Sequence, residues 1–428
     1  MLFNQTLTYI SLFSGAGVGC YGLLEEGFEC VATNEILEKR LNIQRINRKC
    51  KLDESYISGD IKKPETKEKI LKQIGFYSKK FGNDRVDLVV ATPPCQGMSV
   101  ANHKKKNDEI KRNSLVVESI DLIKQIKPRF FILENVPSFY KTGCIDKNDN
   151  LLEIGSMIEQ NLSGDYMLYD EVINFKNFGA NSSRTRTLVI GVCKEFKDFT
   201  SALEFFPDFK QEKTLKEVIG SLKPLAWGEY DSADFYHSFR TYPKHMQEWI
   251  KDLKEGQSAF ENVQDAISDL AYLCSNEGAF ESDYLNPIQS SYQALMRKNS
   301  PKLYNHQATN HSQAALEKLK LINKEQGKEC LPKNLHGKQQ FKSTWGRLNW
   351  NKISPTIDTR FDTPSNGTNS HPELHRSITP REAARIQSFS DNYIFYGNKT
   401  SVCKQIGNAV PPLLALALGK AILKNLRK

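Results

Sequence analysis

Cys95 is the residue whose type and position most favour chemistry. It lies in the segment ATPPCQG (91–97), directly after an apolar run, 86–91, that is rich in β-branched side chains. Such a run predicts a buried strand of a parallel sheet, and the two prolines end it because neither can donate a ladder hydrogen bond. The thiol is therefore expected at the carboxyl edge of the sheet, where open α/β sheets bind ligands, unless it is only a small buried hydrophobe.

A carboxyl group follows another strand in the same way. Glu134 comes directly after the apolar run 129–133. If the two strands are neighbours, their ends bring the Cys95 thiol and the Glu134 carboxyl together at one edge of the sheet. A carboxyl at the mouth of an apolar strand is partly desolvated, which raises its pKa and lets it donate a proton near neutral pH. The alternative role of Glu134 is to cap a helix or loop.

A glycine-rich turn, FSGAGVG (13–19), leaves the first predicted strand and opens a helix, and Glu35 falls 20 residues after Gly15. Glycines let a ligand approach the backbone, the helix start offers unpaired N–H groups, and a carboxylate at this distance can accept from two ribose hydroxyls. The pattern predicts a nucleotide site. NAD is disfavoured, because Gly17 is followed by Gly19 and a dinucleotide fingerprint places its third glycine three residues after the second.

The elements that must position these residues alternate along the first half of the chain. Apolar runs predict strands over 7–12, 30–33, 86–91, 129–133, 166–175 and 187–193. Apolar residues at three-to-four spacing predict helices over 17–26, 37–48, 67–79, 114–125 and 151–162. Repeated βα units predict an α/β fold with a doubly wound, mostly parallel sheet. Asp60, after a further candidate strand, could accept from an adenine amino group, unless Gly59-Asp60 is only a turn pair.

Composition limits the class of protein. The chain has 428 residues, 39% of them hydrophobic and 25% charged, which is typical of a globular protein of two or three domains. No apolar run approaches the roughly 20 residues that span a bilayer, and no signal pattern is found, so we expect a cytoplasmic protein. The nine scattered cysteines include no Cys-x-x-Cys pair, and Pro372 disrupts the helix that a metal site at His371 and His375 would need. No metal is expected.

Charge is distributed unevenly. The chain carries a net charge of +9. Residues 196–283 hold 9 Lys and Arg against 17 Asp and Glu, a net −8, whereas residues 284–350 hold 11 against 3, a net +8. The second segment is therefore expected to face DNA. It is also rich in side chains that can reach base edges or phosphates, namely Gln289, Ser290, Tyr292, Arg297, Asn305, His306, Asn310, His311 and Arg347.

Six motifs, found together and in order, resemble those of the bacterial DNA (cytosine-5)-methyltransferase family. They are FSGAG (13–17), PCQ (94–96), ENV (134–136), Arg184-x-Arg186, REAAR (381–385) and GNAVPP (407–412). The resemblance covers about residues 7–420 apart from a variable stretch near 196–340. Six ordered motifs are far more specific than any one of them.

The resemblance implies a chemistry that suits the residue types. The Cys95 thiolate would add to C6 of a flipped-out cytosine while Glu134 protonates or hydrogen-bonds N3, so that C5 can attack an activated methyl group. Arg184 and Arg186 would contact the cytosine and its phosphate, and their charge would favour the thiolate. A surface ion-pair ladder is their alternative role. Ser182 stands where the family commonly has glutamine, so that amide contact is in doubt.

The resemblance also implies S-adenosylmethionine as the cofactor and double-stranded DNA as the partner. The residues expected at the cofactor are Phe13, Gly15, Gly17, Glu35, Asp60, Ile61, Pro94, Leu115, Asn408 and Ala409, although a leucine in an amphipathic helix, such as Leu115, is more often part of the core. The residues expected at DNA are Gln96, Ser99, Arg112, Arg297 and Arg347. The polar, basic loop 96–112 would close over DNA and deliver Cys95, its alternative being a solvated loop.

The expected organisation is a catalytic and cofactor-binding domain over 1–195, a target-recognition domain with hinge over 196–397, and a helix over 398–428 that returns to the first domain. The expected protein is a monomeric DNA (cytosine-5)-methyltransferase of a restriction-modification system, with any cognate endonuclease acting separately. Three alternatives stay open at this point. They are an RNA cytosine-5 methyltransferase, which would keep Cys95 and Glu134, a nicotinamide oxidoreductase, and a non-catalytic DNA-binding module.

Overall fold

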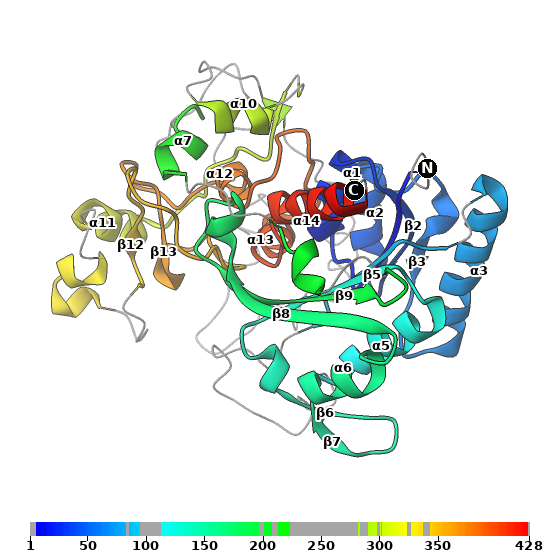
Figure 1. Cartoon of the computed structure of the whole chain (residues 1–428). Coiled ribbons are helices and arrows are strands. Elements are labelled where there is room, and N and C mark those ends of the chain that lie inside the picture. The colour runs from blue at the N-terminus through cyan, green and yellow to red at the C-terminus, as the bar shows by residue number, and fades with distance from the viewer. Residues whose placement is uncertain are drawn as a thin grey trace, which may run out of the picture. The chain divides into compact units, whose positions relative to one another are not determined.

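The computed structural model forms two compact units, Met1–Lys213 with Ala409–Lys428, and Thr214–Asn408 (Figure 1). The residues that it describes are 6–82, 85–94, 113–196, 201–207, 213–222, 281–282, 290–297, 300, 302–322, 327–336 and 343–426. The unit boundaries fall at 213/214 and 408/409, against predicted domain boundaries at 195/196 and 397/398. Residues 398–408 thus lie in the second unit, whereas the prediction assigned all of 398–428 to the returning helix.

The first unit is built on a seven-stranded sheet of order β3-β2-β1-β4-β5-β9-β8. Its strands are β1 (Thr8–Leu12), β2 (Glu29–Glu35), β3 (Tyr56–Ser58), β4 (Leu88–Ala91), β5 (Phe130–Asn135), β8 (Tyr166–Asn174) and β9 (Thr185–Cys193). The first five strands are parallel, while β9 runs antiparallel to both of its neighbours. This confirms the predicted α/β fold with a mostly parallel sheet.

Helices cover both faces of this sheet, because strands buried on both sides need apolar partners above and below. The helical elements are η1 (Val18–Cys20), α1 (Tyr21–Glu25), α2 (Glu38–Ile46), η2 (Asp53–Ser55), α3 (Pro64–Phe81), α5 (Leu115–Ile126), η3 (Phe139–Lys141), α6 (Ile154–Leu162), η4 (Phe175–Phe178), η5 (Ala202–Phe205) and α14 (Pro412–Leu426). One core cluster joins the sheet to α3, α5 and α6. A second joins it to α1 and α14 on the other face (Figure 1).

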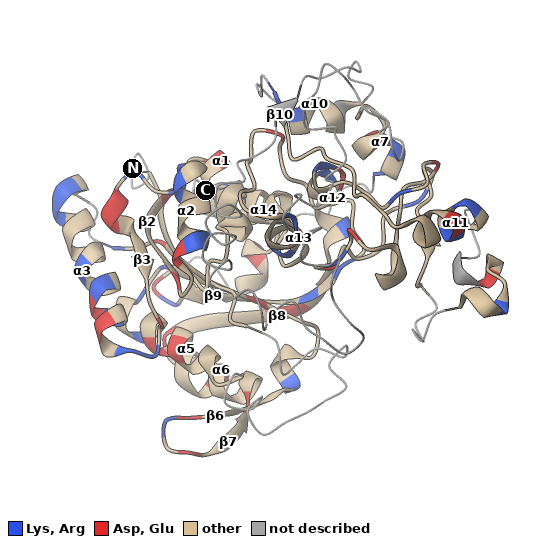
Figure 2. Ribbon diagram, turned by 180° about the vertical axis from the view of Figure 1, so that it is seen from behind, with Lys and Arg blue, Asp and Glu red and all other residues tan. Residues whose placement is uncertain are grey.

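Local signals explain where these helices begin and end. Helix α3 is longer than the predicted 67–79, because Pro64 occupies its first turn and Gly82, with φ of 74°, closes its C-terminus. Its outer side carries interspersed Lys and Glu (Figure 2). The helix predicted over 151–162 begins later than expected, since Leu151–Glu153 form strand β7, which pairs with β6 (Gly143–Ile145) before α6 starts.

The C-terminal helices form a long apolar stretch. By length and composition Lys399–Leu426 could cross a membrane, which the expectation from the sequence did not allow for. The stretch consists of two helices, α13 (Lys399–Gly407) and α14, separated by residues 408–411, and 78% of its most apolar window is buried inside the protein. Burial of this kind is typical of a core helix, and α14 packs in the core of the first unit.

The second unit holds shorter elements. They are α7 (Leu215–Ile219), β10 (Glu281–Ser282), α10 (Ser291–Arg297), β11 (Leu303–Tyr304), α11 (Gln313–Leu321), η7 (Gly327–Cys330), η8 (Lys333–Leu335), β12 (Gly346–Arg347), η9 (Pro364–Asn366), β13 (Thr368–Ser370), α12 (Pro380–Ile386) and α13. The sequence predicts helices over 312–323 and 379–387, with Ser312 and Thr379 as their N-caps. Helices α11 and α12 confirm both predictions, because the two side chains accept from the backbone N–H groups of Ala315 and Glu382. Apolar residues at helical spacing also predict helices over 244–253 and 263–273, and these segments lie outside the described residues.

Helix α12 is the buried centre of this unit. Arg376 pairs with Glu382 through two hydrogen bonds of 2.8 Å, and Arg385 binds Asp391 at 3.0 and 2.6 Å. Arg381 donates to three backbone carbonyls. All five side chains are almost completely buried. The REAAR motif therefore organises the second unit from within.

Candidate active site

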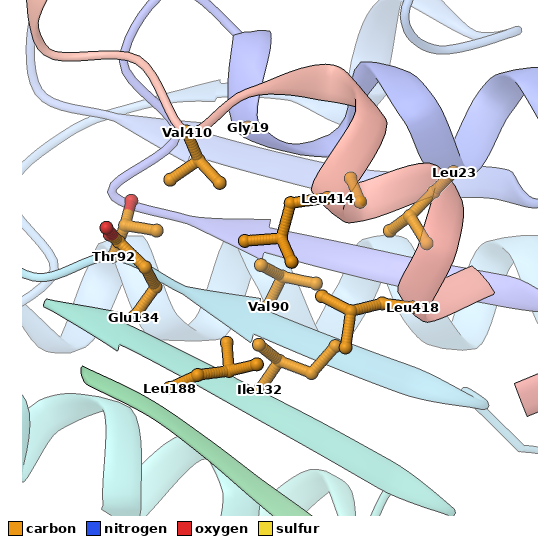
Figure 3. Close-up of a pocket in the computed structure, with 11 residues that line it drawn as sticks. Gly19, Leu23, Val90, Thr92, Ile132, Glu134, Leu188, Val410, Leu414 and Leu418 are labelled. Atoms are coloured by element: carbon orange, nitrogen blue, oxygen red, sulfur yellow. The ribbon is translucent and has the colours of Figure 1, made fainter. Parts of the chain in front are cut away.

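The carboxyl ends of β4 and β5 meet at one edge of the sheet. Ala91 pairs with Leu133, so that Thr92 and Glu134 follow at the same level on neighbouring strands. Figure 3 shows their side chains next to each other. The Asn135 amide donates a hydrogen bond of 2.9 Å to the carbonyl of Pro93, which ties the two strand ends together. Sequence reasoning assigned no role to Asn135, although it stands beside Glu134 within the ENV motif.

Cys95 lies just outside the described residues, as do Gln96, Ser99 and Arg112. The last described residue before it is Pro94, which is half-buried. Asn135 fixes the end of β4 beside Glu134, and Cys95 follows Pro93 by two positions in the sequence. The meeting of the Cys95 thiol with the Glu134 carboxyl therefore stays a prediction.

Glu134 is only 9% exposed and lies against an apolar wall. A cavity of about 20 Å³ behind it is lined by Val90, Ile132, Leu188, Leu414 and Leu418 among others (Figure 3). Burial raises the pKa of the Glu134 carboxyl above its usual range, although the charges of Arg186 and Arg184 act in the opposite direction. A carboxyl of this kind can hold a proton and donate it.

Two arginines reach the same edge because β9 runs antiparallel to β5 and begins where β5 ends. Nε of Arg186 lies 3.2 Å from Oε1 of Glu134, and its Nη1 donates to the carbonyl of Thr185 at 2.8 Å. Arg184 is 7% exposed, and its charge acts on Glu134. The structure thus brings together three of the four predicted catalytic residues, Glu134, Arg184 and Arg186.

Ser182, the residue that departs from the family pattern, is completely buried. Within the described part of the chain its hydroxyl has no hydrogen-bond partner. A serine hydroxyl is much shorter than a glutamine amide, so Ser182 cannot make the contact of the longer side chain in the same place.

The glycine turn has the backbone that its residue types predict. Gly15 and Gly17 have φ values of 54° and 86°, a region that favours glycine, and Phe13 shares it with φ of 53°. The Gly15 N–H donates to Oε2 of Glu35 at 2.9 Å. A Cβ at Gly15 would meet no atom within 4 Å, so the turn has open space on that side into which a ligand can approach.

The Glu35 carboxylate at the end of β2 is 4% exposed and well oriented. It accepts from the backbone N–H groups of Gly15 and Leu37, at 2.9 and 3.1 Å. Arg40 completes the set at 3.3 Å from both oxygens, and its side chain is 36% exposed. Ligand hydroxyls could replace Arg40 as hydrogen-bond partners of the Glu35 carboxylate. This carboxylate, beside an open glycine backbone, therefore fits the two hydroxyls of a ribose.

The other residues predicted at the cofactor differ in exposure. Asp60 is half-buried, and its Oδ1 accepts from the N–H of Lys62 at 3.0 Å. Ile61 is 3% exposed and belongs to the core, against which Phe13 and Leu115 also pack. The two predicted cofactor residues nearest the C-terminus fall in different units. They are Asn408, exposed at the C-terminus of α13, and Ala409, which is buried.

Arg347 is not placed as a DNA contact would be. It is 7% exposed, and its guanidinium donates to the backbone carbonyls of four residues, Leu319, Ile322, His371 and Leu374. An arginine whose donors are taken up in this way holds loops together, so we no longer assign Arg347 to DNA. Arg297, at the end of α10, is partly exposed, and its contact with DNA stays a prediction.

Three histidines of this unit also make hydrogen bonds within the protein. The ring of His371 accepts from the backbone N–H groups of Glu373 and Leu374, at 3.2 and 3.1 Å, in a segment that is not helical. His306 contacts Thr379, and His311 accepts from the N–H of Ser377. No group of three or more metal-ligating side chains occurs among the described residues.

The fold and this site match one protein family. The chain belongs to the C-5 cytosine-specific DNA methylase family, whose model matches residues 7–424. Among similar proteins, the type II methyltransferase M.DdeI of Desulfomicrobium norvegicum is 30% identical over 79% of this chain and 72% of its own length. The type II methyltransferase M1.HphI of Haemophilus parahaemolyticus is 26% identical over 99% of this chain and 88% of its own.

A solved structure supports the same assignment. A crystal structure of an E. coli chain named as a prophage-encoded DNA modification methyltransferase is 25% identical to this chain, with a TM-score of 0.61, and covers 99% of this chain and 100% of its own. The protein is therefore an S-adenosylmethionine-dependent DNA (cytosine-5)-methyltransferase. The open alternatives of an oxidoreductase and of a non-catalytic DNA-binding module are excluded by this family membership.

Proposed function

We propose that this methyltransferase acts on a flipped-out cytosine within a specific duplex sequence, through a transient bond between Cys95 and cytosine C6, as the modification enzyme of a type II restriction-modification system. The observation that carries the proposal is the buried Glu134, with its raised pKa and its contact of 3.2 Å to Arg186, at the strand end beside the one that leads to Cys95.

The proposed reaction forms and then breaks one covalent bond between the enzyme and the base. The Cys95 thiolate attacks C6, and the electron pair displaced from the C5–C6 bond is accommodated as N3 takes a proton from Glu134. C5 is then nucleophilic and bonds to the methyl carbon, while the bond from that carbon to the donor sulfur breaks and its electron pair stays on sulfur as a neutral thioether. A base removes the C5 proton, the C6–S bond breaks, and N3 returns its proton to Glu134. The thiolate is regenerated for the next turnover.

S-adenosylmethionine, when bound, supplies an electrophilic methyl group on a sulfonium. The chain's own residues bind and orient it. Glu35 would accept from the ribose hydroxyls, the open side of Gly15 would admit the ligand to the backbone, and Asp60 would face the adenine end. Phe13, Gly17, Ile61, Pro94, Leu115, Asn408 and Ala409 complete the proposed cofactor set.

Arg184 and Arg186 have two tasks in this proposal. Their charges favour the Cys95 thiolate and bind the phosphate of the flipped nucleotide. Arg186 also orients the Glu134 carboxyl toward N3, because its Nε holds one carboxyl oxygen. Extruding the base costs a few kcal/mol of stacking, and Gln96, Ser99 and Arg112 are proposed to contact the DNA from which it leaves.

Sequence recognition is assigned to residues 196–397, with the basic segment 284–350 toward DNA. Arg297 is the described residue that we assign there. The enzyme is proposed to act as a monomer, and a cognate endonuclease, where one exists, to act separately. A cytoplasmic location follows from the DNA substrate of a bacterial modification enzyme.

Mechanism-based trapping tests the proposal. Duplex DNA with 5-fluorocytosine at the target position, incubated with S-adenosylmethionine, should give a covalent protein–DNA complex that survives denaturing gel electrophoresis, because fluorine at C5 cannot leave as a proton. Cys95→Ser should give none while still binding duplex DNA. A complex formed by Cys95→Ser would exclude Cys95 as the nucleophile. Tritiated cofactor offered with duplex DNA or with tRNA checks the substrate class.

A further inference from the structure

A buried amide lies beneath the glycine turn. Gln44, in α2, is 0% exposed, and its Nε2 donates to Oγ of Ser14 at 2.8 Å and to the carbonyl of Gly15 at 2.7 Å. Its Oε1 accepts from the hydroxyl of Thr33 at 2.8 Å. Three hydrogen bonds therefore join one side chain of α2 to the turn and to strand β2.

The direction of these hydrogen bonds is determined by a buried lysine. Lys49 is 3% exposed, and its Nζ donates to Oγ1 of Thr33 at 3.1 Å. An ammonium group can only donate, so the Thr33 hydroxyl is left to donate its own proton to Oε1 of Gln44. The NH₂ group of Gln44 must then face Gly15, whose carbonyl can only accept.

The packing between Gln44 and the turn is close. A Cβ at Gly17 would lie 2.6 Å from Cγ of Gln44 and 3.2 Å from Cδ of Lys49, distances that require the neighbours to move. Gly17 is therefore needed both for its φ of 86° and for the approach of Gln44. A Cβ at position 17 and the present position of the Gln44 side chain exclude each other.

Gly15 is consequently held from two sides. Its N–H donates to Glu35 at the end of β2, and its carbonyl accepts from Gln44 in α2. The remaining side of this residue is the open space that a ligand can enter. Two hydrogen bonds with opposite directions fix the rotation of the peptide groups on either side of Gly15, and so decide which backbone atoms the ligand meets.

We propose that Gln44, and Lys49 through Thr33, are positioning residues for S-adenosylmethionine, which hold the glycine turn in its binding conformation before the cofactor arrives. This inference rests on the proposed cofactor site. Without the amide, the Gly15 carbonyl and the Ser14 hydroxyl lose a donor, and the turn samples other conformations. The apparent dissociation constant then rises in inverse proportion to the fraction of the protein that is competent to bind.

The test uses the full chain and isothermal titration with S-adenosylmethionine. Gln44→Met keeps the volume but removes all three hydrogen bonds, and Lys49→Met and Thr33→Val interrupt the chain of hydrogen bonds further from the turn. Each should raise the dissociation constant for the cofactor, Gln44→Met by about tenfold and the other two by less. Affinity for duplex DNA and kcat at saturating cofactor should stay within about twofold of wild type.

Gln73→Met is the matched control. Gln73 is also a buried helical glutamine of the same unit, 6% exposed, and its amide donates to Oγ of Ser55 at 3.0 Å. Its loss should leave cofactor affinity unchanged. Amide hydrogen exchange without ligand should become faster at Ser14–Gly17 in Gln44→Met and not in Gln73→Met. A purely structural role of Gln44 would not produce this pattern.

The outcomes separate the inference from the site on which it rests. If Glu35→Gln weakens cofactor binding but Gln44→Met and Thr33→Val do not, the positioning role is wrong and the site stands. If none of the three changes cofactor affinity, the cofactor binds elsewhere and both fail. Should Gln44→Met not fold, Thr33→Val decides, because it preserves shape and removes only the hydroxyl that connects Lys49 to Gln44.

Discussion

Nε of Arg186 lies 3.2 Å from Oε1 of Glu134, yet the pKa of this glutamate is raised rather than lowered. The cause is burial against the apolar wall formed by β4, β5, β9 and α14, which outweighs the charge of the arginine. The carboxyl is thus held in one orientation and can still carry a proton. Both properties are required of a group that protonates the cytosine ring at N3.

Glu134→Gln should slow methyl transfer more than it weakens binding. Glutamine keeps the size of the side chain but has no transferable proton, so the single-turnover rate is expected to fall by about 100-fold or more. The dissociation constants for DNA and cofactor should change by less than about threefold. Rapid-quench assays with tritiated cofactor, together with equilibrium binding, measure both. Equal losses in rate and DNA affinity would indicate a role in binding alone.

The Glu134 carboxyl should titrate above its ordinary value of about 4.5, and Arg186→Met should move its pKa further up, because the arginine favours the charged form. Infrared difference spectroscopy of the protonated carboxyl, or carbon NMR of labelled glutamate, measures this directly. Arg85→Met is the control, since Arg85 pairs with Glu195, an exposed carboxylate, and does not act on Glu134. A downward shift in Arg186→Met would contradict the assignment.

Much of this site could be predicted from the sequence, because its signals are local. Apolar runs identified β4 and β5, and a polar residue directly after a parallel strand must lie at the carboxyl edge. Arg347 and Gln44 show where such reasoning ends. An arginine in a basic segment can bind either DNA phosphates or buried backbone carbonyls, and the sequence does not distinguish the two. A glutamine in an amphipathic helix likewise gives no indication in the sequence of which turn it packs beneath. Both roles depend on contacts between segments that are distant in sequence.

Asp391→Asn should destabilise the second unit strongly. The aspartate is completely buried and binds Arg385 at 2.6 Å, with Arg381 3.8 Å away. Neutralising it leaves buried guanidinium charge without its partner, which typically costs about 3 to 5 kcal/mol. Asp53→Asn, in an exposed pair with Arg45, should change stability by less than about 0.5 kcal/mol. Urea unfolding followed by circular dichroism compares the two. Equal losses of unfolding free energy in the two variants would show that the buried ion pair stabilises the protein no more than the exposed one.

Acid should destabilise the second unit through its histidines. Burial lowers the pKa of His311 from 6.5 to about 4 and that of His371 to about 3. Between these values and 6.5 the unfolded chain binds more protons than the folded one, so stability falls as the pH drops from 6.5 toward 4, by at most about 1.4 kcal/mol per pH unit for each group. His311→Gln should flatten the slope of unfolding free energy against pH. An unchanged slope would place the titration elsewhere.

Arg347 and Arg297 should respond in opposite ways when each is replaced by methionine. Arg347→Met removes the group that donates to four backbone carbonyls, of which the Leu374 carbonyl still accepts from the Arg376 N–H at 2.9 Å. The unfolding free energy should therefore fall by about 2 to 4 kcal/mol, while the folded protein binds DNA normally. Arg297→Met, at a partly exposed helix end, should leave stability nearly unchanged. It should weaken DNA binding and reduce the salt dependence by about one phosphate contact.

The two measurements are calorimetric unfolding and fluorescence anisotropy of labelled duplex DNA at several salt concentrations. The pair of variants serves as its own control, since each removes one guanidinium from the same unit. A loss of DNA affinity in fully folded Arg347→Met would return that residue to the DNA-binding set, because the hydrogen bonds to Leu319, Ile322, His371 and Leu374 would then have to open when DNA binds. If instead Arg297→Met binds DNA as wild type does, the phosphate contacts lie elsewhere in the basic segment 284–350.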